Sequence, residues 1–150
     1  MSISVIFAGI GIGLMVGLSG VGSAIGLAVG GSSAIGAIKK KPEVFGSSLL
    51  LSALPATQGL YGFVCFILFS RLAVSPDMSL YQGTMTLAAG MAMGLAGLFS
   101  AIQQGKVCAA GISAMGSGHD TFGNTLILAV FPEFYAVLAL VVSILIVLNL

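Results

Sequence analysis

A single carboxylic acid lies deep inside a long apolar stretch of this sequence. Glu133 is 12 residues into the apolar segment 121–149, so a helical rise of about 1.5 Å per residue places it about 18 Å from that end. An ionisable group near the middle of a bilayer costs about 2.5–3.5 kcal/mol or more, and by default it marks a functional site. The alternative is an ion pair with Lys106 that only fixes helix packing. Lys106 lies nearer the membrane surface and can extend its ammonium group toward it.

Further polar side chains are expected at the same depth as this carboxylate. Counted along the helices from the nearest polar loops, all of them lie 14–17 residues away: Thr57, Gln58, Gln104 and Glu133. Polar groups at this depth either form hydrogen bonds between helices, which is common in membranes, or act as ligands beside the carboxylate. We favour ligands, because the carboxylate is expected in the same layer.

One helix face in the second apolar segment carries several of the candidate groups. They follow one another at positions i, i+3, i+4 and i+7: Leu54, Thr57, Gln58 and Tyr61. Pro55 has no N–H for the carbonyl four residues earlier, and its ring crowds that carbonyl, so we expect the backbone to be loosened here. Carbonyl oxygens at such breaks commonly help to hold Na⁺ in membrane proteins. A carbonyl near Leu54 is therefore a further candidate ligand.

Together these groups indicate that a cation is bound. A carboxylate alone is enough to carry a proton, whereas hard metal cations need several oxygen ligands to replace their water. The carboxylate, two amides, one hydroxyl and one carbonyl offer about five oxygens with one negative charge. One charge neutralises Na⁺, whereas a divalent ion would keep a net charge in the membrane. The set favours Na⁺, with H⁺ as the alternative, and nothing indicates a catalytic residue, bond-making chemistry or an organic cofactor.

The composition predicts that the elements holding these residues are membrane-spanning helices. The 150 residues are 58% hydrophobic and 6% charged, whereas a soluble domain has about 25% charged residues. Four apolar segments, each longer than the roughly 20 residues that cross a bilayer, lie at about 4–37, 44–70, 80–115 and 121–149. Four open strands would leave backbone groups unsatisfied in lipid, so we expect an all-α membrane protein with one domain over 1–150. Lys and Arg are too few to bind nucleic acid.

The charged residues also predict the orientation of the chain. Three lysines cluster at 39–41, and short loops with Lys and Arg stay on the cytoplasmic side. The loop at 38–43 is therefore expected in the cytoplasm, and the loop at 116–120 as well, because two spans separate them. Both termini and the loop at 71–79 are then outside. We expect a multi-pass protein of the cell membrane, of bacterial type and surrounded by lipid.

The sequence contains an internal repeat. A shift of 77 residues aligns 17–68 with 94–145 without a gap and makes 16 of the 52 pairs identical. A composition this biased would give roughly five identities by chance, so a duplication is the better interpretation. The chain is therefore predicted to consist of two tandem helical hairpins, at about 4–70 and 80–149.

The two hairpins differ at the position that matters for the ion. Pro55 aligns with Pro132, but directly after these prolines the first half has Ala56 and the second has Glu133. Two hairpins therefore share one carboxylate. We regard this asymmetry as the most informative feature of the sequence.

Glycines at four-residue spacing predict close helix packing, because small residues let membrane helices approach one another. They are frequent in the first and third segments, and the fourth has only Gly123. The candidate packing residues are Gly9, Gly13, Gly17, Gly22, Gly26, Gly30, Gly90 and Gly94. Glycine-rich odd helices and bulky even helices suggest the inner wall and the outer layer of a ring. The alternative is one compact four-helix monomer.

Three local motifs resemble one known family. LPATQGLY at 54–61, SAIQQGK at 100–106 and Glu133 are similar to the duplicated proteolipid of the V-type ATPases, in its bacterial sodium-pumping form. The resemblance covers nearly the whole chain. It departs from the sodium-type pattern at Phe134, where that pattern has Thr, and at Gln103, where a small residue is usual.

The resemblance implies a non-catalytic, ion-translocating subunit of a rotary ATPase. It implies a homo-oligomeric membrane ring that turns against a stator membrane subunit and is driven, through central-stalk subunits, by a separate ATPase head. By motif, the implied site consists of Glu133 as ion carrier, Gln104, Gln58 and Thr57 as side-chain ligands, Leu54 as carbonyl ligand, and Tyr61 as the hydroxyl that holds Glu133.

Proteins of two other classes share some of these features. A small four-helix cation or multidrug antiporter also uses one membrane carboxylate, but we would expect that carboxylate in the first helix and Trp in the pocket, and the chain has no Trp. A purely structural pore or scaffold would not need a carboxylate surrounded by amides. The sequence therefore predicts a rotor subunit that carries Na⁺, or H⁺ in the alternative.

Overall fold

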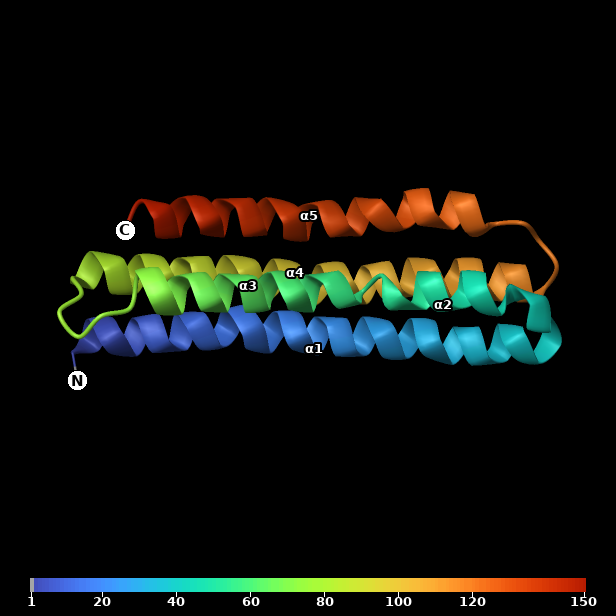
Figure 1. Ribbon diagram of the computed structural model, residues 1–150, viewed down its shortest axis with the longest axis horizontal. Coiled ribbons are helices and arrows are strands. Elements are labelled where there is room, and N and C mark those ends of the chain that lie inside the picture. The colour runs from blue at the N-terminus through green and yellow to red at the C-terminus, as the bar shows by residue number, and fades with distance from the viewer. Residues whose placement is uncertain (1) are drawn as a thin grey trace.

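The computed structural model describes residues 2–150, which form four long helical spans joined by short loops (Figure 1). The elements are α1 (Ile3–Lys40), the short η1 (Pro42–Val44), α2 (Phe45–Ala53), α3 (Ala56–Leu72), α4 (Leu80–Gly116) and α5 (Phe122–Leu148). Each predicted apolar segment is helical, and each predicted break lies between spans. All four spans are long and apolar enough to cross a membrane, so the chain is a multi-pass membrane protein.

Local signals explain where the helices begin and end. Ser2 caps α1 by accepting a backbone N–H at 3.4 Å. Ser79 and Gln82 form a capping box at the start of α4, in which each side chain accepts the backbone N–H of the other residue, at 3.2 and 2.9 Å. After α4 the chain turns through Gly118, whose φ of 96° is a conformation that glycine adopts without strain.

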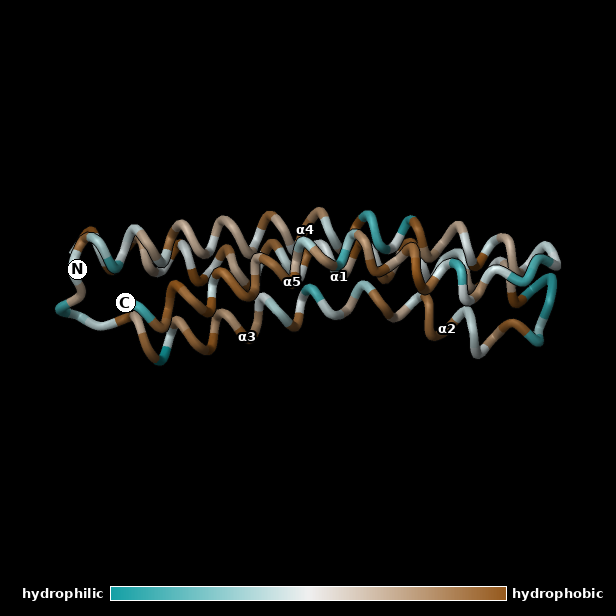
Figure 2. The backbone as a smooth tube through the Cα atoms, turned by 90° about the horizontal axis from the view of Figure 1, so that it is seen from above, coloured by the Kyte–Doolittle hydropathy of each residue, from teal (hydrophilic) through white to brown (hydrophobic). Residues whose placement is uncertain are grey.

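The spans pack as two rows of antiparallel helices (Figures 1 and 2). α1 and α4 form one row, and α3, preceded by α2, forms the other with α5. The loops at 38–43 and 116–120 lie at one end of the bundle, and both chain ends lie with the loop at 71–79 at the opposite end (Figure 1). In Figure 2 hydrophobic residues follow most of each helix, and hydrophilic residues gather at the two ends.

Glycines bring α1 and α4 into direct backbone contact. A Cβ on Gly22 would lie 2.5 Å from the Cα of Leu98, and a Cβ on Gly105 would lie 2.6 Å from the Cα of Gly26. Similar close approaches occur at the predicted packing residues Gly26, Gly30, Gly90 and Gly94. No side chain fits at these points, which is why the two helices can lie so close together.

Three of the predicted packing glycines behave differently. A Cβ on Gly9, Gly13 or Gly17 would meet no atom within 4 Å, because these residues lie on an exposed face of α1. Their predicted role in packing is therefore not fulfilled inside the chain. The four-residue spacing identifies a face of the helix, but it does not say what covers that face.

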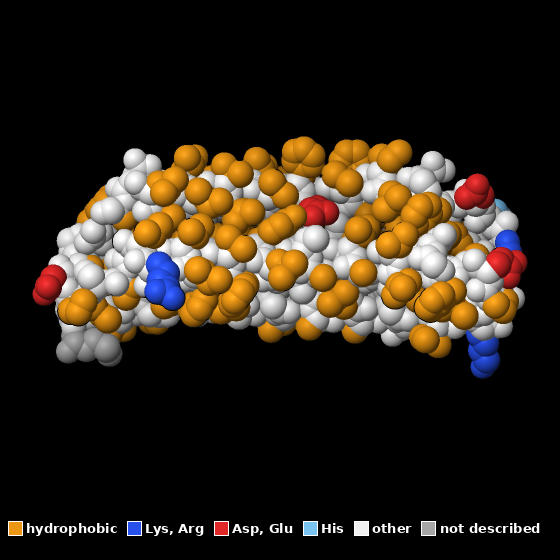
Figure 3. All heavy atoms as spheres, in the orientation of Figure 1, with side chains coloured by type: hydrophobic (Ala, Val, Ile, Leu, Met, Phe, Trp, Pro, Cys, Tyr) orange, Lys and Arg blue, Asp and Glu red, His pale blue; other side chains and the backbone are white. Residues whose placement is uncertain are grey.

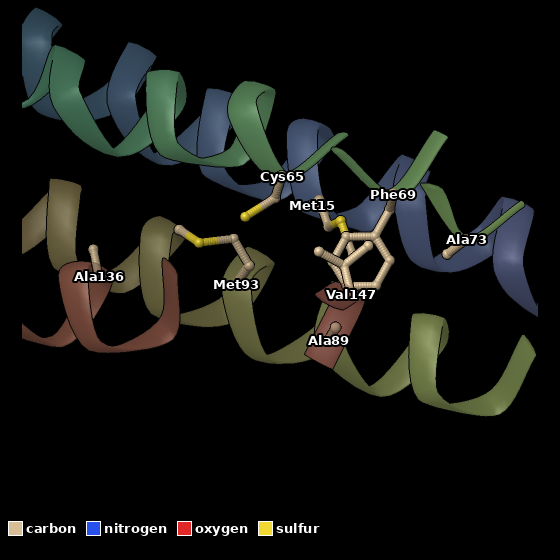
Figure 4. Close-up of a cluster of buried hydrophobic side chains, with 8 residues drawn as sticks. All are labelled: Met15, Cys65, Phe69, Ala73, Ala89, Met93, Ala136 and Val147. Atoms are coloured by element: carbon tan, nitrogen blue, oxygen red, sulfur yellow. The ribbon is translucent and has the colours of Figure 1, made fainter. Parts of the chain in front are cut away.

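A buried apolar cluster joins the two halves of the chain (Figure 4). Met15 of α1, Phe69 of α3 and Met93 of α4 are fully buried, and Val147 of α5 is nearly so. The cluster therefore takes side chains from all four spans. It fixes the relative positions of the helices beside the layer in which the polar side chains meet.

Candidate ion-binding site

Glu133 lies near the middle of α5 and is half-buried. Figure 3 shows acidic atoms at both ends of the bundle and also at mid-length, where hydrophobic side chains surround them. Among residues 2–150 the single ion pair joins Lys41 and Glu43 at 3.9 Å, so Lys106 does not pair with Glu133. Lys106 is instead exposed. The carboxylate must therefore be held by neutral groups.

Two side chains from different helices bond to this carboxylate. The Tyr61 hydroxyl of α3 donates to Oε1 of Glu133 at 2.8 Å, and Nε2 of Gln104 on α4 donates to Oε2 at 2.9 Å. Hydrogen bonds to an ionised acceptor are stronger than those between neutral groups. Three helices from both halves of the chain thus meet at one carboxylate, and each of its oxygens holds one donor.

Gln104 is fully buried and is held at three points. Its Nε2 also donates to the Ala129 carbonyl at 2.9 Å, and its Oε1 accepts from Nε2 of Gln58 at 2.9 Å. Because the Ala129 carbonyl and an ionised Glu133 can only accept, the amide nitrogen must face them. The sequence analysis placed an oxygen of Gln104 near the carboxylate. The structure brings this residue to the carboxylate, but with its nitrogen in front.

Gln58 extends the network back to the first hairpin. This residue is fully buried, and its Nε2 donates to Oγ of Ser100 at 3.0 Å in addition to Gln104. Its Oε1 accepts from the Thr57 hydroxyl at 3.2 Å. Donors therefore follow one another from Thr57 through Gln58 and Gln104 to Glu133. Hydrogen bonds in series polarise one another, so such a chain acts as a unit.

The helix break predicted at Pro55 is present. α2 and α3 are separated there, whereas α5 continues through the equivalent Pro132. The Leu54 carbonyl accepts the backbone N–H of Thr57 at 3.2 Å, and the Thr57 hydroxyl lies 3.1 Å from the same oxygen. The oxygens of Leu54, Thr57 and Gln58 thus lie side by side at the break.

The chemistry of the site is that of hard oxygen donors with one negative charge. Neutral carbonyl, hydroxyl and amide oxygens suit a hard cation, whereas soft metals select thiolates or imidazoles. The part of the chain that the structure describes contains no group of three or more His, Cys, Asp or Glu side chains placed to hold a metal ion. The residues brought together therefore fit a monovalent cation better than a transition metal.

Sequence reasoning missed three partners of the network. They are the Ser100 hydroxyl, the Ala129 carbonyl, and the Ser23 hydroxyl, which accepts the backbone N–H of Gly59 at 2.8 Å. Ser23 and Ser100 are identical residues at equivalent positions of the repeat, and that identity could have pointed to them. Ala129 acts through its backbone, so its side chain gives no signal of this role.

Comparisons with known proteins give the same architecture. The chain matches the family of the ATP synthase C subunit twice, over residues 10–69 and 87–146. It is 45% identical over 132 residues to the K subunit of the V-type sodium ATPase of Enterococcus hirae, which covers 87% of this chain and 83% of that protein. It is 42% identical over 142 residues to the K subunit of the A-type ATP synthase of Methanocaldococcus jannaschii, which covers 93% of this chain and 61% of that protein. It is 26% identical over 137 residues to the human 16 kDa proteolipid of the V-type proton ATPase, which covers 91% and 88% of the two chains.

The two family matches explain both the repeat and the fold. They start 77 residues apart, which is the same shift that aligns the two halves of the sequence. The predicted fold class, four long apolar helices in two tandem hairpins, is confirmed. A small multidrug antiporter is excluded, because the matches cover most of the chain. The chain therefore belongs to the family of the ATP synthase C subunit, as a duplicated membrane proteolipid of the V-type and A-type rotary ATPases.

Proposed function

We propose that the chain is a rotor-ring subunit that carries Na⁺ across the membrane on Glu133. The observation that carries this proposal is the mid-span carboxylate, which is linked through Gln104 and Gln58 to a cluster of neutral oxygens. The name of the Enterococcus hirae relative, which belongs to a sodium ATPase, supports Na⁺. The human relative is named for a proton ATPase, and a carboxylate alone is enough for H⁺, so H⁺ is the second candidate.

The charge of the site suits a monovalent ion. Glu133 brings one negative charge to the middle of the span, and the other proposed ligands are neutral: Leu54, Thr57, Gln58 and Gln104. With Na⁺ bound, the net charge is zero, and the loaded site can face lipid at little electrostatic cost. A divalent ion would leave one positive charge in a medium where charges are expensive.

Ion binding requires a rearrangement at Gln104. In the structure its amide nitrogen faces the carboxylate and its oxygen accepts from Gln58. For the oxygen of Gln104 to become a ligand, the amide must turn and release Glu133 and the Ala129 carbonyl. The cation then replaces the N–H as the partner of the carboxylate. Tyr61 keeps its hydrogen bond and holds Glu133 in place throughout.

The proposed setting is a homo-oligomeric ring in the cell membrane. The loops at 38–43 and 116–120 face the cytoplasm, in line with the lysines at 39–41, and are the surface available to central-stalk subunits. The half-buried face of Glu133 is available to a stator membrane subunit, at which the ion is exchanged. Lipid covers the remaining apolar surface, such as the exposed side chains of α5.

Carbodiimide labelling tests this proposal. The reagent reacts with a protonated carboxyl group, and Na⁺ competes with H⁺ for one carboxylate, so Na⁺ should protect Glu133 from labelling. We expect labelling of Glu133 that falls as Na⁺ is added, with protection that weakens as the pH is lowered. Glu133→Gln should abolish both labelling and saturable binding of ²²Na⁺.

Two results separate the candidates. Labelling of Glu133 that Na⁺ does not reduce, together with no saturable ²²Na⁺ binding, would leave a proton-carrying rotor. Labelling confined to Glu43 or Asp120, with Glu133 inert, would remove Glu133 as the ion carrier. Both exposed carboxylates lie in or next to the loops and serve as internal references.

A further inference from the structure

Two apolar surfaces of this chain have no partner within it. One is the glycine face of α1, formed by Gly9, Gly13, Gly17 and Gly20, where an added Cβ would meet no atom within 4 Å. The other is the α4/α5 groove, a hollow of about 600 Å³. It is lined by Leu95, Ala96, Phe99 and Gln103 of α4 and by Phe131 and Tyr135 of α5.

The internal repeat shows what covers the equivalent of the α4/α5 groove. The 77-residue shift maps the groove residues onto Leu18, Ser19, Gly22, Gly26, Leu54 and Gln58 of the first hairpin. The second hairpin packs on several of these positions: Ser19 donates to the Met93 carbonyl at 3.2 Å, and Gln58 donates to Gln104. A groove that is filled once inside the chain is thus repeated, unfilled, on the second hairpin.

The glycine face is the matching half of the same contact. The α4 residues that cover the first hairpin include Gly90, Gly94 and Gly97, and a Cβ on Gly97 would lie 3.2 Å from the Cα of Ser19. The 77-residue shift maps these three glycines onto Gly13, Gly17 and Gly20, which belong to the glycine face. The chain therefore exposes both halves of a contact that it already makes internally.

We infer that the α4/α5 groove of one copy receives the glycine face of the next copy, in the register that places Ala96 beside Gly20. This inference rests on the proposed ring for its setting. The contact joins two different surfaces, so it is head-to-tail, and repetition of such a contact closes into a ring when the rotation allows it. It also gives Gly9, Gly13 and Gly17 the packing role that they lack within one chain.

The contact between copies is wider than the internal one. Phe99 and Gln103 stand where the first hairpin has Gly22 and Gly26, and these glycines allow backbone contact. Their larger side chains hold the neighbouring α1 further away and fill the space between the helices. In a membrane such contacts are stabilised mainly by van der Waals packing and not by the hydrophobic effect.

The same register places a sealed counterpart of the ion site at the boundary between copies. On the incoming copy, Ala56 stands where the carboxylate does, and Leu27 stands where Gln104 does. On the groove side, Tyr135 stands where Gln58 does. The ligand positions are thus taken by apolar or aromatic residues from two copies. The boundary offers a cation no carboxylate and no amide, and each chain carries one ion.

Cysteine cross-linking of the intact protein in its membrane tests the register. Ala96→Cys with Gly20→Cys should give disulfide-linked multimers on mild oxidation, at multiples of the 15.0 kDa chain, because bonded cysteines have Cα atoms about 4.4–6.8 Å apart. Ala96→Cys with Gly9→Cys is the matched control, since 11 residues shift the thiol by about 16 Å. It should give no multimers. Gly9 and Gly20 both have room for a side chain, and each single variant accounts for the native cysteines.

An exchange of the carboxylate tests the sealed counterpart. Ala56→Glu combined with Glu133→Gln moves the acid to the equivalent position of the first hairpin. We expect saturable ²²Na⁺ binding to fall at least 100-fold, while gel filtration shows an intact oligomer. Wild-type affinity in the exchanged chain would overturn the sealed counterpart.

The outcomes for the contact are also distinct from those for the ion. Multimers from the Gly9 pair in place of the Gly20 pair would overturn the register. No linkage in either pair would overturn the contact and leave the groove to lipid, even where the wild type binds Na⁺ as proposed. Linkage of the Gly20 pair in a protein that binds no Na⁺ would support the contact and refute the sodium function.

Discussion

Replacing Gln58 by Met tests whether the polar layer binds a metal ion or only orients a carboxylate. Met is flexible and similar in length, so it can fill the buried position, but it offers no strong oxygen ligand or N–H. The change removes the amide oxygen 3.2 Å from the Thr57 hydroxyl and the donors to Ser100 and Gln104. Both hydrogen bonds that Glu133 accepts from Tyr61 and Gln104 can remain.

The expected magnitude follows from the burial of Gln58. The loss of an interaction with a charged group costs about 1.5–3 kcal/mol, which is roughly a 10- to 150-fold increase in the Na⁺ dissociation constant. Gln58 is fully buried, so water cannot easily supply the missing oxygen. Proton binding should change far less, because Gln58 is not hydrogen-bonded to Glu133 directly.

The assay is ²²Na⁺ titration of the purified oligomer at fixed pH, with carbodiimide labelling of Glu133 in parallel. Ser100→Ala is the matched control, because it removes one acceptor of Gln58 but keeps the amide oxygen; a change of only about threefold is expected. An unchanged dissociation constant in the Met variant, with saturable binding by the wild type, would refute Gln58 as a ligand.

Other substitutions test the supporting structure. Tyr61→Phe removes the 2.8 Å hydrogen bond to the carboxylate and should raise the Na⁺ dissociation constant about tenfold in the same titration; equal affinity would show that the hydroxyl does not support the site. Pro55→Ala should let the helix close across its break and weaken Na⁺ binding, whereas Pro132→Ala, in a helix that is already continuous, should not. Gly26→Leu should prevent folding, because a Cβ there would lie 2.6 Å from that of Pro55, whereas Gly13→Leu should keep the helical circular dichroism of the wild type and reduce only the size of the oligomer on native gels. Equal damage from both glycine variants would contradict the packing described.

The helical spans could be predicted from the sequence because lipid leaves the backbone few alternatives. The third segment was predicted at 80–115, and α4 covers Leu80–Gly116. The first was predicted at 4–37, but α1 continues to Lys40. The reason is that Lys39 and Lys40 are favourable in the last turn of a helix, where the dipole is negative, so the charges that mark the loop do not end the helix.

The depth of the site could also be predicted, but its detailed contacts could not. Counting from the loops works because the spans are straight enough and antiparallel, so Gln58, Gln104 and Glu133 meet in one layer. The orientation of the Gln104 amide depends on the Ala129 carbonyl, a backbone group that any residue type supplies. Residue types and spacing therefore locate the side chains without saying which atom faces which.

The same limit applies to the glycines. Gly9, Gly13 and Gly17 have the same four-residue spacing as Gly22, Gly26 and Gly30, but only the second group packs within the chain. Periodicity defines a helix face, whereas the partner of that face depends on how the helices are arranged in space. The repeat supplies part of the missing information, because it relates the uncovered glycines to covered ones on α4.

The donors around Glu133 bear on the choice between the two ions. Each hydrogen bond to a charged acceptor is worth about 1.5–3 kcal/mol, so Tyr61 and Gln104 together offset a cost of about 2.5–3.5 kcal/mol for a charge at mid-membrane. A proton arriving at either carboxylate oxygen meets a donor that already occupies it. Protonation thus costs a hydrogen bond and gains no new ligand. A Na⁺ ion also displaces the Gln104 nitrogen, but when that amide turns its oxygen becomes available, and the oxygens beside the Pro55 break add to it. The rearrangement of Gln104 therefore supplies ligands to a metal cation, whereas for a proton it only removes a hydrogen bond.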